Sequence, residues 1–274
     1  MTRRTFLATS AALGLKQPGP WLCVFSKHLA SVPVAELGGV ARDLGFDGVD
    51  LTVRPKGHVL PGEVNATLAP AVEALRAAGL DVPMITTELL SAGDPAARPT
   101  LETAHRLGIP YFKPGYWKPE PLETLRPKAK GLFFLALRAG MMAGVHNHSG
   151  NYFGALPYEY QLLLEGTTPD FAGYYFDPAH ATIEGGLQGW RTYLAQALPR
   201  LKMVAIKDYV WEKRKVRWCP LGEGMVDWAA MFDAFKAANF AGPISLHVEY
   251  ETKDERTALA KDLEFLRRFV PKRG

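Results

Sequence analysis

The sequence has little cysteine, with only Cys23 and Cys219 among 274 residues. Two thiols cannot form the disulfide framework of a small secreted domain, so the fold must depend on a hydrophobic core. No run of about 18 apolar residues is present, and we therefore expect no stable membrane association. A strong charge of one sign is also missing, because 32 Lys and Arg residues oppose 28 Asp and Glu residues. The net charge of +4 argues against nucleic-acid binding.

What the sequence does contain is the composition of a folded globular domain. Hydrophobic residues make up 47% of the chain and charged residues 22%, which allows a sizeable core. The length fits one large α/β domain better than two small ones. The sequence does not decide between a monomer and a homo-oligomer.

The first 19 residues form a segment of a different character. Arg3 and Arg4 precede a short stretch of small, weakly hydrophobic residues, as in a twin-arginine export signal. No clean cleavage site follows, so a basic terminus on a cytoplasmic protein is the alternative. We favour export to the periplasm and expect the folded domain to cover residues 20–274.

Eight apolar segments typical of β-strands alternate with eight segments of helical period. The expected strands are Trp21–Ser26, Gly48–Val53, Val82–Thr87, Tyr111–Lys113, Gly144–His148, Gly173–Asp177, Lys202–Asp208 and Pro243–Tyr250. The expected helices are Val34–Leu44, Leu68–Ala78, Arg98–Leu107, Pro121–Ala143, Tyr158–Glu165, Gly189–Leu198, Trp228–Ala238 and Glu255–Phe269. This alternation predicts an α/β fold, a single-domain (β/α)8 TIM barrel. An open doubly wound sheet would need a glycine-rich turn after the first strand, and Ser26–Leu29 contains no glycine.

Polar and ionisable residues recur where the expected strands end. They are Ser26, His28, Thr52, Arg54, Thr87, Glu88, Lys113, His146, His148, Asp177, His180, Lys207, Asp208, His247 and Glu249. The carboxyl ends of all barrel strands meet at one rim, where the active sites of such barrels lie. We therefore predict an active site there. The loop of residues 209–220 is long enough to form a lid over it.

Histidine and carboxylate side chains inside a barrel must be paired, hydrogen-bonded or bound to metal. Residues of equal parity share a strand face, which groups His247 with Glu249 and His146 with His148. Asp177 and His180 form an Asp-x-x-His pattern at the end of the sixth expected strand. Such a donor set suits Mn2+, Co2+ or Zn2+ better than Ca2+. We predict one divalent ion, held by the ligands His146, His148, Asp177 and Glu249.

Six segments together resemble the xylose isomerase-like barrels, a group that includes sugar phosphate isomerases and epimerases, D-tagatose 3-epimerase and endonuclease IV. The segments are LGFDGVDL at 44–51, HNH at 146–148, DPAH at 177–180, IKD at 206–208, LGEGMVD at 221–227 and SLHVE at 245–249. The resemblance covers essentially the whole chain after residue 20. It implies a divalent metal held by Glu, Asp, His and Glu from strands five to eight.

Two of these four implied ligands match and two depart. Asp177 and Glu249 keep the family residues, whereas His146 stands where Glu is usual and Ala205 where His is usual. Asp177, Glu249 and one of the two histidines, His146 or His148, would still leave coordination positions open for substrate. A metal-free site is the alternative.

The resemblance implies an isomerase or epimerase that acts on a small carbohydrate by removing a proton next to a carbonyl. Glu249 is the predicted base, Lys207 polarises the carbonyl or donates a proton, and His180 assists catalysis. The predicted substrate-binding residues are His28, Arg54, Lys113, His180 and His247. A lyase or hydrolase using the same residues, or a non-catalytic sugar-binding relic, remain the alternatives.

Overall fold

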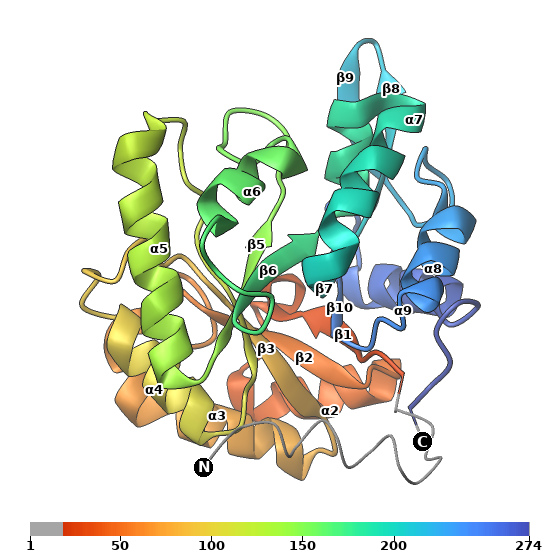
Figure 1. Cartoon of the computed structure of the whole chain (residues 1–274). Helices are drawn as coiled ribbons and strands as arrows, with labels where there is room; N and C mark the ends of the chain where they lie inside the picture. The colour runs from red at the N-terminus through yellow and green to blue at the C-terminus, as the bar shows by residue number, and fades with distance from the viewer. Residues whose placement is uncertain (1–18, 274) are drawn as a thin grey trace, which may run out of the picture.

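Eight parallel strands close into a barrel in the computed structural model, which describes residues 19–273 (Figure 1). The strands are β1 (Leu22–Phe25), β2 (Gly48–Val53), β3 (Asp81–Thr87), β4 (Tyr111–Lys113), β5 (Met142–His146), β6 (Ala172–Phe176), β7 (Leu201–Ile206) and β10 (Ile244–Leu246). Pairing of β1 with β10, in which Leu22 lies opposite Ile244, closes the ring. The predicted (β/α)8 barrel is confirmed. The twin-arginine pattern lies outside the described residues.

Helices surround the barrel and cover the outer face of its strands (Figure 1). They are α2 (Val34–Leu44), α3 (Val64–Ala77), α4 (Ala97–Arg106), α5 (Leu122–Ala139), α6 (Pro157–Leu164), α7 (Pro178–Ala197), α8 (Trp228–Ala237) and α9 (Glu255–Leu266). Helix α3 shows the pattern behind their packing, since it buries Leu68, Val72 and Leu75 at helical spacing. None of the helices within residues 19–273 has the length and apolarity that a membrane crossing requires.

Helix α7 begins much earlier than the expected start at Gly189. Asp177 caps its amino end by accepting a hydrogen bond from the backbone N–H of His180, and Pro178 occupies the first helical position. Both residues favour a helix start directly after β6. Gly186, with φ of 66°, interrupts the helix before residue 189, which explains why only the second part has an unbroken helical pattern.

Five strands, β1, β5, β6, β7 and β10, end before their predicted limits. Strand β5 ends at His146 and β10 at Leu246, so His148 and Glu249 belong to the loops that follow. The alternation of strand faces therefore does not determine where these two side chains point. Both nevertheless reach the same cavity, as described below.

Residues 208–219 form a β-hairpin instead of the loop that the sequence predicted. Strands β8 (Asp208–Glu212) and β9 (Lys215–Cys219) pair antiparallel, and Lys213 and Arg214 at the turn have φ of 48° and 65°. Positive φ at both central residues is the geometry of a tight hairpin turn. The hairpin projects from the end of the barrel beside α7 (Figure 1).

Asp208 anchors the base of this hairpin to the following loop. Its carboxylate accepts hydrogen bonds from five donors: the backbone N–H groups of Tyr209, Gly222, Gly224 and Val226, and Nε1 of Trp228. This one side chain therefore fixes the conformation of the LGEGMV segment and connects it to the residue directly after Lys207.

We expect Asp208→Ala to lower the free energy of unfolding by about 2–4 kcal/mol, because buried donors lose their acceptor. Asp208→Asn keeps one oxygen acceptor, so its free energy of unfolding should lie between that of Asp208→Ala and that of the wild type. Urea unfolding measures both, with Asp233→Ala on the exposed surface of α8 as the control. Equal midpoints for Asp208→Ala and the control would contradict this anchoring role.

Candidate functional site

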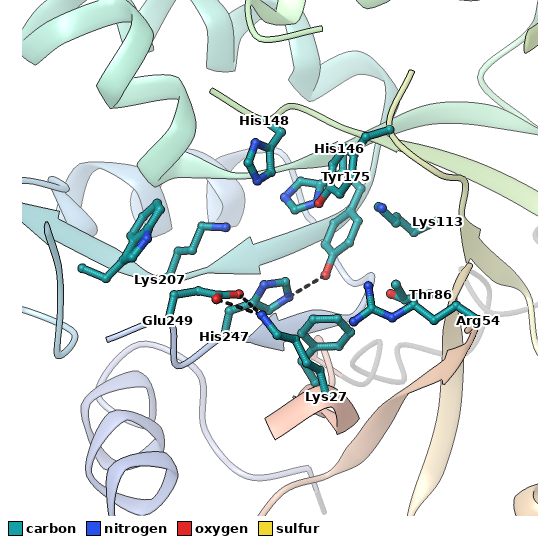
Figure 2. A pocket seen from close by; sticks show the side chains of 13 residues that line it. Lys27, Arg54, Thr86, Lys113, His146, His148, Tyr175, Lys207, His247 and Glu249 are labelled. Carbon is teal, nitrogen blue, oxygen red and sulfur yellow. Dashed lines mark hydrogen bonds and ion pairs between the residues drawn. The ribbon is translucent and has the colours of Figure 1, made fainter. Parts of the chain in front are cut away.

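A cavity of about 250 Å³ opens at the carboxyl ends of the barrel strands. It is lined by Phe25, Lys27, Arg54, Thr86, Lys113, Tyr116, His146, His148, Tyr175, Lys207, Trp218, His247 and Glu249 (Figure 2). This volume equals that of about eight water molecules, which is room for one monosaccharide. Seven of the ten predicted site residues are among the lining side chains. Asp177, His180 and His28 are not.

Asp177 lies fully buried beneath this lining. Its Oδ2 atom is 3.0 Å from Nζ of Lys207 and 3.1 Å from Nε2 of His146. Burial acts to raise the pKa of Asp177, but Lys207 and His180 outweigh it and hold that pKa below its ordinary value. The carboxylate is therefore ionised, and it holds the Lys207 ammonium at the cavity by a short ion pair.

The tautomer of His146 follows from its two partners. An ionised Asp177 can only accept, so Nε2 of His146 carries the proton and donates it. The other nitrogen, Nδ1, then accepts from the Tyr116 hydroxyl at 2.6 Å. Burial and the neighbouring Lys207 lower the pKa of His146 well below its ordinary value, which keeps the ring neutral. Both ring nitrogens of His146 are thus engaged.

Glu249 lies at the cavity wall as an ionised carboxylate. Its two oxygens are 3.0 Å and 2.9 Å from Nζ of Lys27, which follows β1 in a short 3-10 helix, Ser26–Leu29. Burial acts to raise the pKa of Glu249, but Lys207 and Lys27 together hold it below its ordinary value. Sequence reasoning missed Lys27 because no pattern pairs it with a residue 222 positions away.

His180 and His28 support the site from behind the cavity wall. His180 is fully buried, with its ring 4.0 Å from that of His148, and its Nε2 has no hydrogen-bond partner among the described residues. Nε2 of His28 accepts a hydrogen bond from the N–H of Val248, which fixes the loop that carries Glu249. Neither His28 nor His180 is among the side chains that line the cavity, so their predicted contacts with substrate stay predictions.

The floor of the cavity is a polar network inside the barrel. Asp50 accepts hydrogen bonds from Thr86 at 2.8 Å and from Ser245 at 2.8 Å. The hydroxyl of Tyr175 lies 3.4 Å from Asp50 and 3.2 Å from Nε2 of His247. Asp50 on β2 is thus hydrogen-bonded to the neighbouring strand β3 and also to β10. Tyr175, two positions before Asp177 on the same strand face, was not predicted, although this spacing could have identified it.

The four predicted metal ligands are not assembled as a metal site. Within residues 19–273, no group of three or more His, Cys, Asp or Glu side chains is placed to hold a metal ion. Asp177 binds the Lys207 ammonium, both nitrogens of His146 are engaged, and Glu249 is paired with Lys27. On β7, Ala205 presents a methyl group that cannot act as a ligand. The residues present do not fit a divalent ion in this arrangement.

The cavity has two chemically different sides (Figure 2). Arg54, Thr86 and Lys113 come from the neighbouring strands β2, β3 and β4 or the loops directly after them. Lys207 and Glu249 follow β7 and β10, which are paired with each other on the other side of the barrel. Trp218 of the hairpin also lines the cavity, a contact that sequence reasoning missed because it read residues 209–220 as a loop.

The chain belongs to the xylose isomerase-like TIM barrel family, whose profile matches residues 39–269. No curated protein sequence gives a significant match. The structure is similar to D-allulose 3-epimerase from Methylomonas sp., with a TM-score of 0.70, 17% identity, and coverage of 93% of this chain and 99% of that one. It is also similar to 3-keto-D-glucoside 4-epimerase from E. coli, with a TM-score of 0.68, 17% identity, and coverage of 86% of this chain and 94% of that one. A xylose isomerase-like protein from Mycobacterium smegmatis, solved in complex with magnesium, has a TM-score of 0.64, 16% identity, and coverage of 88% of this chain and 90% of that one.

Five histidines at or beneath the cavity have lowered pKa values, chiefly because burial disfavours the charged ring. The pKa is about 4 for His28 and His148 and well below 6.5 for His146, His180 and His247. Between pH 6.5 and 4 the unfolded chain therefore binds more protons at these sites than the folded protein. Asp50 and Asp262, with pKa values that burial raises to about 6, oppose this effect but are fewer.

We expect stability to fall as the pH decreases from 6.5 to 4, by up to about 1.4 kcal/mol per pH unit for each unopposed histidine. Urea unfolding at a series of pH values measures the slope. His247→Gln should flatten it by about one proton, whereas His105→Gln, at an exposed position, should leave it unchanged. An equal dependence of stability on pH in both variants would contradict the lowered pKa of His247.

Proposed function

We propose that this protein is an isomerase or epimerase of a small sugar and acts by proton transfer at the carbon next to a carbonyl. The observation that carries the proposal is an ionised carboxylate, Glu249, on the same side of a monosaccharide-sized cavity as the oriented ammonium of Lys207 (Figure 2). The fold is shared with D-allulose 3-epimerase and 3-keto-D-glucoside 4-epimerase, which supports the same class of reaction.

Glu249 is the base in this proposal. It removes the proton from the carbon next to the carbonyl, and the electron pair left behind moves onto the carbonyl oxygen to give an enediolate. The Lys207 ammonium donates a hydrogen bond to that oxygen and stabilises the negative charge as it develops. Asp177 holds the ammonium in place, so its orientation costs little during the reaction.

Inversion at carbon requires a second group on the opposite face of the substrate. His146 was the sequence-based candidate, but both of its ring nitrogens are engaged. His148 is the better candidate, because its Nδ1–H donates to the carbonyl of Ser149 at 2.9 Å and Nε2 has no hydrogen-bond partner among the described residues. Nε2 can take the substrate proton from that face when Glu249 is the protonated partner, and in the opposite direction it must first take up a proton from solvent and then deliver it to the carbon. Return of the proton by Glu249 to the former carbonyl carbon, together with transfer of the hydroxyl proton of the neighbouring carbon to the former carbonyl oxygen, would instead give isomerisation.

Glu249→Gln removes the base, and we expect the rate constant for exchange of the substrate proton with solvent deuterium to fall about 10²–10⁴-fold. Lys207→Met should lower it about 10²–10³-fold, because the oxyanion loses its donor. NMR exchange assays with the neutral sugars D-allulose and L-ribulose and with the anionic sugars D-glucuronate and D-glucose 6-phosphate measure this. Lys261→Met on the exposed face of α9 is the control. Full exchange activity in Glu249→Gln would refute the proposal.

The predicted divalent ion, Mn2+, Co2+ or Zn2+, takes no step in this mechanism, because its donors are engaged with other partners. The magnesium complex of the Mycobacterium smegmatis protein supports a divalent ion in this site. Ala205, which cannot bind a metal, and the ion pair of Asp177 with Lys207 instead support the Lys207 ammonium as the cation at the substrate oxygen.

We expect the purified protein to contain well below one divalent ion per chain and to keep its exchange activity in EDTA. Elemental analysis of the wild type, Asp177→Ala and Glu249→Ala decides this. If the wild type contains one ion per chain and both variants lose it, the predicted metal site is correct, and Lys207 is not the group that stabilises the substrate oxyanion.

A further inference from the structure

The charged side chains that line the cavity are mostly basic. Five charged side chains line it, and four of them are basic: Lys27, Arg54, Lys113 and Lys207. Lys27 is paired with Glu249 at 2.9 Å. Lys207 is paired with the buried Asp177 at 3.0 Å. Within the described residues, Arg54 has only a long ion pair with Glu88, at 3.8 Å, and Lys113 has no carboxylate within 4.0 Å.

Lys113 is the more demanding of these two cations, because it is only 2% exposed. Its ammonium lies 3.4 Å from the centre of the Tyr116 ring, and no carboxylate within the described part of the chain lies within 4.0 Å of it. Asp50 is near enough to influence it, but the oxygens of Asp50 already accept from Thr86 and Ser245. A buried ammonium without an anion is costly, so this position is prepared for a partner from outside.

Arg54 stands beside Lys113 and extends toward the cavity (Figure 2). Its nearest carboxylate, Glu88, is 3.8 Å away and its side chain is 55% exposed, which makes that pair weak. A guanidinium offers a planar pair of N–H donors that matches the oxygens of a carboxylate or a phosphate. Thr86 adds a hydroxyl on the same side of the cavity.

We propose that the substrate is an anionic sugar, and that Arg54 and Lys113 bind its carboxylate or phosphate group. This inference rests on the proposed function, because it assigns the reacting carbonyl to the opposite side, where Lys207 and Glu249 lie. A cavity of about 250 Å³ then holds one monosaccharide between the two sides, with its anionic substituent at the strands β2 to β4. Neutral sugars would offer neither cation an opposite charge.

Binding of such an anion should depend on pH. Burial, and next the nearby Arg54, lower the pKa of Lys113 to about 7. The other charged groups that face Lys113 are Asp50, Glu88 and Lys207. A bound anion favours the protonated amine, so we expect proton uptake on binding and weaker affinity as the pH rises above 7.

Equilibrium binding tests the proposal with matched ligands: D-glucuronate, D-glucose 6-phosphate and neutral D-glucose, measured by calorimetry at pH 6.5 and low salt. We expect at least one of the anionic ligands to bind 10-fold or more tightly than D-glucose. The ratio between D-glucuronate and D-glucose 6-phosphate identifies which anionic group the site takes. Equal affinity for all three would overturn the proposal.

Two variants locate the effect. Arg54→Met and Lys113→Met should each reduce the preference for the anionic ligand at least 10-fold and change the affinity for D-glucose less than threefold. Lys118→Met, which removes a cation outside the cavity, should leave the preference unchanged. A preference that survives in both cavity variants, with circular dichroism showing that they are folded, would overturn the proposal. Because the readout is binding, it is independent of the proton exchange that tests the proposed function.

Discussion

Asp177 is fully buried, and a carboxylate in such surroundings is stable only where cations and hydrogen-bond donors surround it. The chain meets this constraint with the Lys207 ammonium, with Nε2–H of His146 and with the amide at the start of α7. Each partner is then fixed in turn. The ring of His146 orients the Tyr116 hydroxyl, the capped helix carries His180, and Lys207 is directed at the place where substrate oxygen would lie. The geometry of the site follows from the requirements of one buried charge.

The fold could be predicted from the sequence because its signals are local. The periods of strands and helices and glycines such as Gly45, with φ of 96° at the end of α2, mark most elements to within a few residues. The predictions that were wrong have local causes too. The segment between Pro178 and Gly189 contains small residues and glycines that weaken its helical pattern, and the turn at Lys213–Arg214 lacks the glycine that would indicate a hairpin.

The site could be predicted only in part. Position at the end of a strand identified seven of the lining residues, since a barrel brings all such positions to one rim. The partner of each side chain could not be predicted, because partners come from distant segments: Lys27 reaches Glu249, and Tyr116 reaches His146. For the same reason the sequence indicated a metal-binding set, while the structure places an ammonium against its central carboxylate. Residue types suggest which chemistry is available, but the hydrogen-bond and ion-pair partners of each side chain determine which group can perform it.

The hairpin differs from the rest of the β-structure in one further respect. Closure of the barrel leaves no strand edge free, whereas the two-stranded sheet of β8 and β9 has an outer edge on each strand. Such edges are where a second chain can add a strand and start aggregation. The hairpin tip carries Glu212, Lys213, Arg214 and Lys215, and charges at an edge oppose strand addition. The two ends of this twelve-residue hairpin thus have different roles. Trp218 near its base lines the cavity, whereas the charged tip opposes association with neighbouring molecules.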